Sequence, residues 1–292
     1  MPPFLALVVV TAVWGITFVQ VKDAVALYPV AAFLAIRFAI AAAVLGPIGA
    51  GRLLALGRVG LRTGLVVGAA LAAGYGLQTA GLERTTVSSA GFITGLFVPL
   101  TPILAFALFR LSSPRLTWAG AAVGTAGLAL LSGVGVGDPL GDLLVLGAAA
   151  SFAVHIVLLD RYSRGHDALA LTLVQMLTAA VVFSLLALAL GELEVPRGWT
   201  VWSALVVTGV FASALAFLVQ TWAQQRTTAA QAALLMALEP VWTAFFGYVL
   251  AGDRLGVAGW AGAALIMAGI VLAEPAAAQA LRRLVPQRSV LE

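Results

Sequence analysis

The sequence predicts an all-α membrane protein whose ten transmembrane helices form two five-helix repeats of inverted topology. Composition, a series of long apolar segments and a repeat at a fixed offset support this fold class. Of the 292 residues, 62% are hydrophobic and only 10% are charged, and the mean hydropathy is +1.07. Because a soluble domain carries about 25% charged residues, we expect most of the surface of this chain to face lipid.

Ten apolar segments have roughly the 17 to 25 residues that a helix needs to cross a bilayer. They cover residues 4–21, 29–49, 62–82, 86–110, 115–133, 141–159, 167–190, 200–222, 228–250 and 255–274. Short connections such as RLSSPR at 110–115 predict antiparallel neighbours and no inserted soluble domain. The first segment has neither a basic start nor a small-residue cleavage site, so we expect it to stay in the mature protein.

The distribution of Lys and Arg predicts that both chain ends face the cytoplasm, since cytoplasmic loops carry an excess of these residues. With the N-terminus inside, the inner loops and tail hold Arg52, Arg58, Arg62, Arg110, Arg115, Arg161, Arg164, Arg226, Arg282, Arg283 and Arg288. The outer loops hold only Lys22, Arg84, Arg197 and Arg254, and Arg37 lies inside a span.

Three short motifs recur 142 residues apart. WAGAA stands at 118–122 and 260–264, Arg-Thr-Thr at 84–86 and 226–228, and Ala-Gly at 126–127 and 268–269. Ala and Gly are common in this chain, so WAGAA alone could arise by chance. Three matches at one offset, one of which contains Trp, favour a duplication.

The duplication predicts two domains, residues 1–138 and 139–276, followed by a cytoplasmic tail of residues 277–292. Because each copy holds an odd number of spans, the second copy must enter the membrane in the opposite orientation. Exchanging the conformations of two inverted halves turns an inward-open cavity into an outward-open one, which is a recognised route to alternating access.

Several motifs are similar to a known family. Leu238-Glu239-Pro240-Val241, Gly252-Asp253-Arg254-Leu255 and Trp260-Ala261-Gly262 resemble the second EamA repeat of the drug/metabolite transporter superfamily. Trp14-Gly15, and Arg37 after Pro29 and Phe33, resemble the first repeat. Ser112-Ser113-Pro114 departs from the pattern, because an acidic residue often stands there.

This resemblance covers essentially the whole chain, and it implies a ten-helix carrier of the bacterial inner membrane. Many members of the family export amino acids and other metabolites. Within the family the chain is most similar to the YddG-type exporters of aromatic amino acids. The resemblance therefore implies a small-molecule substrate and a lipid bilayer as surroundings, with the chain a monomer or a homodimer.

Two charged residues inside the spans need an explanation. Arg37 lies about 12 Å and Glu239 about 16 Å from the outer ends of their helices at 1.5 Å per residue, so their depths are similar. Each charge alone would cost on the order of 2.5 to 3.5 kcal/mol near a helix centre, which favours pairing with each other or with backbone carbonyls. Both residues are either substrate or gating contacts or buried anchors, with Glu239 held beside Pro240.

Aromatic and amide side chains near mid-depth, together with His155 about 7 Å from the inner surface, are candidates for a substrate cavity. The candidates are Trp14, Tyr75, Gln78, Phe92, Phe97, His155 and Trp242. Together they describe a site for a large, mostly apolar solute with a polar end, although ordinary helix packing explains each one alone. His155 could relay protons or simply line the pore. Pro99, Pro102 and Pro240 lie where a carrier is expected to bend.

Small-residue faces predict close helix contacts in the fifth and tenth spans. Gly120, Gly124 and Gly127 lie in one span, and Gly262 and Gly269 lie in the other. Such faces serve either packing within the chain or a dimer seam, and the former is favoured here.

The sequence argues against several other function classes. It has no clustered acids or nucleophile and base within the spans, so no enzyme activity is predicted. Two His and no Cys argue against a metal site, and neither GKS nor GKT occurs, so neither a cofactor nor ATP is expected. Scattered rather than clustered Arg argues against nucleic acid. The sequence predicts a secondary carrier that exports small neutral metabolites, namely aromatic or other large neutral amino acids. The alternatives are an exporter of other drugs or metabolites and a passive channel-like facilitator.

Overall fold

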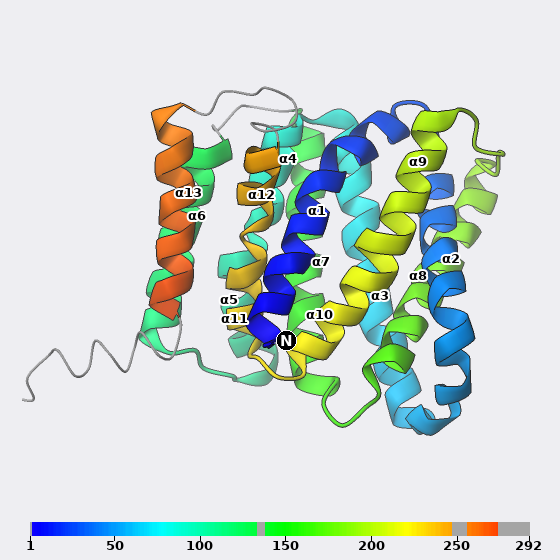
Figure 1. The fold of residues 1–292 in the computed structure, drawn as a ribbon, viewed down its shortest axis with the longest axis horizontal. Coiled ribbons are helices and arrows are strands. Elements are labelled where there is room, and N and C mark those ends of the chain that lie inside the picture. The colour runs from blue at the N-terminus through cyan, green and yellow to red at the C-terminus, as the bar shows by residue number, and fades with distance from the viewer. Residues whose placement is uncertain (1, 133–137, 247–255, 274–292) are drawn as a thin grey trace, which may run out of the picture.

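The computed structural model describes residues 2–132, 138–246 and 256–273, and within these ranges the regular structure is entirely helical. The helices stand side by side, with α6 and α13 together at one edge and α2 and α8 towards the other (Figure 1). Their bounds are α1 Pro3–Val25, α2 Val30–Gly49, η1 Ala50–Arg52, η2 Leu54–Leu56, α3 Gly57–Arg84, α4 Val87–Gly95, α5 Phe97–Phe109, α6 Arg115–Ser132, α7 Pro139–Tyr162, α8 Ala168–Leu190, α9 Trp199–Val207, the π-helix η3 Thr208–Leu215, α10 Ala216–Gln224, α11 Ala229–Met236, α12 Glu239–Phe246 and α13 Val257–Ala273.

Seven helical segments are long and apolar enough to cross a membrane, and three shorter apolar helices accompany them in the part of the chain that the structure describes. The long segments overlap the predicted spans one to four and six to eight, and the short ones overlap spans five, nine and ten. The chain is therefore an integral membrane protein. That all ten segments cross the bilayer remains a prediction, and residues 247–255 and 274–292 lie outside the described residues.

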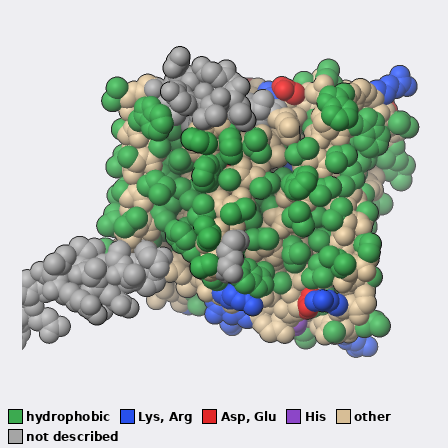
Figure 2. Space-filling view, viewed as in Figure 1, with side chains coloured by type: hydrophobic (Ala, Val, Ile, Leu, Met, Phe, Trp, Pro, Cys, Tyr) green, Lys and Arg blue, Asp and Glu red, His purple; other side chains and the backbone are tan. Residues whose placement is uncertain are grey.

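The surface agrees with a lipid environment. Figure 2 shows hydrophobic side chains over the middle of one face, with Lys and Arg gathered at its upper and lower edges. Large apolar side chains such as Leu185, which is 61% exposed, could not be left in water in such number. Lipid therefore acts as the solvent of this surface.

Several helix contacts in one half of the chain have counterparts in the other half. In one set, α3 packs against α7 and α8; in the other, α9, η3 and α10 pack against α1 and α2. Two further pairs, α2 with α8 and α6 with α13, each join helices from corresponding places in the two halves.

Glycines allow α6 and α13 to touch through their backbones. A Cβ at Gly120 would lie 2.4 Å from the Gly269 carbonyl oxygen, and a Cβ at Gly127 would lie 2.6 Å from the Gly262 carbonyl oxygen. Residue numbers increase along α6 in the direction in which they decrease along α13, so the two helices are antiparallel. The preference for packing within the chain is thus confirmed for these four glycines and for Gly124, because a Cβ at Gly269 would lie 2.9 Å from Gly124 N and 3.1 Å from Gly124 Cα.

The predicted fourth and ninth spans are each divided in two, at Leu96 and at Ala237 and Leu238. Pro99 and Pro240 have no N–H, so the carbonyls four residues earlier, those of Gly95 and Met236, lose their helical donor. At the same breaks the backbone forms bonds over three residues, from Leu96 N to Ile93 O at 3.1 Å and from Leu238 N to Leu235 O at 3.1 Å. Pro102 instead lies within α5.

The recurring Arg-Thr-Thr motif starts a helix in each half. Thr86 caps α4 by accepting a hydrogen bond from Ser89 N at 3.1 Å, and Thr228 caps α11 by accepting one from Gln231 N at 3.3 Å. Gln231 Oε1 accepts from Thr228 N in return, which completes a capping box.

Replacement of Thr228 by Ala is expected to lower the free energy of unfolding by about 1 kcal/mol, because the first turn of α11 loses its acceptor. Thermal unfolding of the purified protein in detergent measures the change, and Thr228→Ser, which keeps the hydroxyl, serves as the control. Equal stability of the Ala and Ser variants would show that the cap contributes nothing.

Candidate functional site

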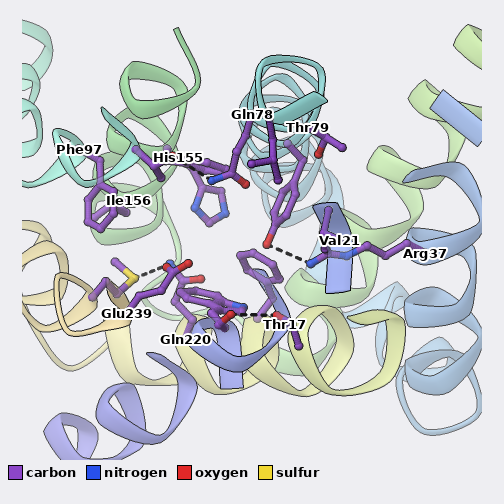
Figure 3. A pocket seen from close by; sticks show the side chains of 17 residues that line it. Thr17, Val21, Arg37, Gln78, Thr79, Phe97, His155, Ile156, Gln220 and Glu239 are labelled. Atoms are coloured by element: carbon purple, nitrogen blue, oxygen red, sulfur yellow. Dashed lines mark hydrogen bonds between the residues drawn. The ribbon is translucent and has the colours of Figure 1, made fainter. Parts of the chain in front are cut away.

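A cavity lies between the two halves of the chain, with a volume of about 720 Å³ that includes the part open to solvent. Side chains from both halves form its wall, and Figure 3 shows them converging on a common space. The lining residues are Trp14, Thr17, Val21, Arg37, Tyr75, Gln78, Thr79, Leu82, Thr94, Phe97, Phe152, His155, Ile156, Phe217, Gln220, Met236 and Glu239.

The structure brings five of the seven predicted substrate-binding residues together. The five that line the cavity are Trp14, Tyr75, Gln78, Phe97 and His155, and Arg37 and Glu239 lie among them. Phe92 and Trp242 are not lining residues, because they pack against the apolar cluster that includes Leu234 and Leu235. From α4 it is Thr94, two residues beyond Phe92, that reaches the cavity.

The three candidate prolines also lie outside the cavity wall. Pro99 and Pro240 stand just after the helix breaks, and both breaks occur next to cavity residues, Phe97 in one half and Glu239 in the other. A role for these prolines would therefore act through the helix shape.

Arg37 is held by hydroxyl groups and aromatic rings. Its Nε donates to Ser213 Oγ at 2.8 Å, and one terminal nitrogen donates to Tyr75 Oη at 3.3 Å. The guanidinium carbon lies 4.5 Å from the centre of the Tyr75 ring, within cation–π range. Neither hydrogen bond goes to Glu239 or to a backbone carbonyl, the two partners expected from the sequence, and Figure 3 places Glu239 across the cavity from Arg37.

The π-helix η3 supplies anchors for two cavity residues. Ser213 accepts from Arg37, and the Ala212 carbonyl accepts from Trp14 Nε1 at 2.8 Å. Sequence reasoning predicted a plain helix at 200–222 and missed this segment. Because π-helical turns occur frequently at functional sites, their position beside the cavity is informative.

Aromatic rings form the apolar part of the wall. Trp14 and Phe217 lie 5.3 Å apart between ring centres, and Tyr75 lies 5.4 Å from Phe152 and 5.9 Å from Phe217, both edge to face. Sequence reasoning did not single out Phe152 or Phe217. Such contacts stiffen the wall and offer a surface to flat apolar groups.

His155 is 1% exposed, and its partner is an amide. Its Nε2 lies 3.0 Å from Gln175 Oε1, and Gln175 Nε2 donates in turn to Thr221 Oγ1 at 3.3 Å. The ring also meets Phe217 edge to face at 5.9 Å. These contacts fit a residue that lines the cavity.

Two glutamines occupy corresponding places in the halves. Gln78 Nε2 donates to Thr94 Oγ1 at 3.1 Å, and Gln220 Nε2 lies 3.5 Å from Met236 Sδ. Both residues of the second pair stand 142 positions after those of the first. Gln220 was missed from the sequence, although Gln-Thr at 78–79 and 220–221 repeats at the same offset and would have found it.

A helical bundle with exposed apolar surface and an internal polar and aromatic cavity is typical of membrane transport proteins. The sequence profile of the EamA-like transporter family matches residues 1–133 and again residues 139–273. The chain therefore belongs to the EamA-like transporter family.

Similar proteins carry the same general description. A protein of Archaeoglobus fulgidus called an uncharacterized transporter is 30% identical over 269 residues, which is 92% of this chain and 84% of that protein. The uncharacterized inner membrane transporter YedA of Escherichia coli strain K12 is 26% identical over 277 residues, covering 93% of this chain and 90% of YedA. A crystal structure at 23% identity shares the fold, with a TM-score of 0.79 over 97% of this chain and 99% of that one.

Proposed function

We propose that the protein is a secondary carrier that exports large neutral amino acids, aromatic ones in particular, across the inner membrane by alternating access. The observation that carries this proposal is the cavity wall, which both halves build from aromatic rings with one Arg and one Glu. A cavity with one side chain of each charge suits a solute without net charge, and the rings suit an apolar side chain.

The arrangement of the helices supports two inverted repeats, residues 1–138 and 139–276. In the antiparallel contact of α6 with α13, Gly120 meets Gly269 and Gly127 meets Gly262. At the offset of 142 residues Gly120 corresponds to Gly262 and Gly127 to Gly269, so each contact is the counterpart of the other. The broken helices α4–α5 and α11–α12 also correspond at the offset of 142 residues. Inverted repeats with interrupted helices at the binding site are typical of alternating-access carriers. The resemblance to YddG-type exporters that the sequence motifs suggest supports export. The excess of Arg in the loops of one side supports cytoplasmic termini.

Counterflow into proteoliposomes tests this function. Vesicles are preloaded separately with Phe, Trp, Met, Leu, Asp or Lys, and the entry of labelled Phe is followed, with protein-free vesicles as the control. We expect the large neutral amino acids to stimulate saturable entry and Asp and Lys to leave it unchanged. Entry that rises linearly with concentration, without stimulation from the opposite side, would instead identify a passive facilitator. Stimulation by no amino acid would remove amino-acid export and direct the search to other metabolites.

A further inference from the structure

One side of the cavity presents hydrogen-bond acceptors. His155, Gln220 and Glu239 lie on this side, and Arg37 lies on the other (Figure 3). The three residues come from α7, α10 and the start of α12, so the tertiary structure alone brings them together.

The orientation of the Gln220 amide follows from a chain of bonds. Gln224 Nε2 donates to the Ile156 carbonyl at 3.2 Å, which makes Gln224 Oε1 the acceptor end of that amide. Gln220 Nε2 donates to Gln224 Oε1 at 2.8 Å, so Gln220 Oε1 points away from Gln224. Gln220 is 2% exposed, and its Oε1 has no hydrogen-bond partner among the described residues. A buried acceptor without a donor is costly unless a ligand supplies one.

The proton on His155 is assigned in the same way. Gln175 Nε2 donates to the Leu171 carbonyl at 3.3 Å and to Thr221 Oγ1 at 3.3 Å, so Gln175 Oε1 faces His155 Nε2 as an acceptor. Nε2 therefore carries the hydrogen in the neutral ring, and Nδ1 keeps a lone pair. Figure 3 shows the His155 ring projecting into the cavity.

Glu239 adds a carboxyl group to these two neutral acceptors. A primary ammonium group has three N–H donors and no acceptor, so it suits a side of the cavity that offers several acceptors. Bonds from an ammonium are stronger than those between neutral groups, particularly where water is excluded. An anionic substrate group on this side would instead meet lone pairs and a carboxylate.

We propose that His155, Gln220 and Glu239 form the subsite that binds the ammonium group of the substrate. The substrate is then an amine with an apolar body, and this inference rests on the proposed carrier function. Arg37, on the other side of the cavity, would donate hydrogen bonds to acceptor groups of the substrate.

Equilibrium binding to the purified protein in nanodiscs tests the subsite with three labelled compounds that share one ring. Phenylalanine carries both charged groups, 2-phenylethylamine lacks the carboxylate, and 3-phenylpropionate lacks the ammonium. We expect the first two to bind and 3-phenylpropionate to bind at least about tenfold more weakly. Empty nanodiscs correct for partitioning into lipid. Equal binding of the amine and the acid, or binding of none of the three, would overturn the proposal.

Variants of Gln220 test whether this residue contributes to the binding of the ammonium group. Gln220→Leu is expected to weaken 2-phenylethylamine about tenfold and to leave 3-phenylpropionate unchanged. Gln20→Leu is the matched control, because Gln20 Oε1 is also buried without a partner among the described residues but Gln20 does not line the cavity. Gln220→Glu keeps an acceptor and should bind the amine at least as tightly as the parent protein. Equal weakening of all three compounds by Gln220→Leu would contradict the subsite.

The two proposals fail separately. If 2-phenylethylamine binds as expected but no amino acid gives counterflow, the ammonium subsite stands and amino-acid export falls. If amino acids give counterflow but the acid binds as tightly as the amine, export stands and the subsite falls.

Discussion

Replacement of Arg37 by Met is expected to abolish counterflow, with transport reduced at least about hundredfold, while folded protein is still obtained. Arg37 is the one Lys or Arg among the lining residues, so its loss removes the positive charge of the cavity. A hydrogen bond to a charged group contributes about 1.5 to 3 kcal/mol, so the loss of those that Arg37 can offer a substrate is enough for an effect of this size.

Arg37→Lys separates charge from geometry. The two bonds of Arg37 leave from different nitrogens, to Ser213 and to Tyr75, and the single ammonium of Lys does not reproduce that fork. We expect Arg37→Lys to retain a few per cent of the counterflow rate, on the order of the loss of one charged hydrogen bond and one cation–π contact. Size-exclusion profiles and thermal unfolding are measured alongside. If Arg37→Met lowers the yield of folded protein and transport together, Arg37 is a buried anchor. If the variant folds and transports normally, Arg37 is neither a substrate or gating contact nor an anchor.

Replacement of Gly127 by Val is expected to destabilise the protein by about 3 kcal/mol or more, since overpacking against rigid neighbours forces helices apart. A Cβ at this position would lie 2.6 Å from the Gly262 carbonyl oxygen and 2.7 Å from Ile266 N. Both atoms belong to the backbone of α13 and cannot rotate away. At roughly 2 to 4 °C per kcal/mol for a chain of this size, thermal unfolding should shift by about 10 °C.

Gly124→Ala is the matched control, because the nearest atom to its Cβ would be Leu234 Cδ2 at 3.8 Å, an ordinary contact. We expect this variant to unfold within about 1 °C of the parent protein or above it, because Ala favours a helix over Gly. A Gly127→Val protein as stable as Gly124→Ala would mean that α6 and α13 do not need backbone contact.

Much of the fold could be predicted because a lipid-facing chain records its solvent in its composition. The apolar segments correspond to the helices of the structure, and the family inferred from motifs around Trp14, Arg37 and Glu239 is confirmed by the profile match. The glycines of α6 and α13 were also interpreted correctly, because a helix face made of small residues allows another helix to approach closely.

The candidate site could be predicted only in part. Depth can be counted along a helix, and this placed Trp14, Tyr75 and Gln78 near the middle of the molecule. Orientation about the helix axis could not be counted, because lipid and protein interior accept the same apolar residues. Phe92 and Trp242 were therefore chosen, while Phe152 and Phe217 were overlooked. The Gln-Thr pair at 78–79 recurs at 220–221, and this repeat would have identified Gln220 as a candidate from the sequence.

The sequence by itself determined that the chain lies in a membrane, how its helices follow one another, and which short motifs its two halves share. Only the tertiary structure decided which side chains meet. Arg37 lies 176 positions before Ser213, and His155 lies 65 positions before Gln220, so no local pattern relates them. The physical reason is that a buried polar group takes whatever partner the packed helices bring within hydrogen-bond distance, and that choice is made by packing rather than by neighbours in the chain.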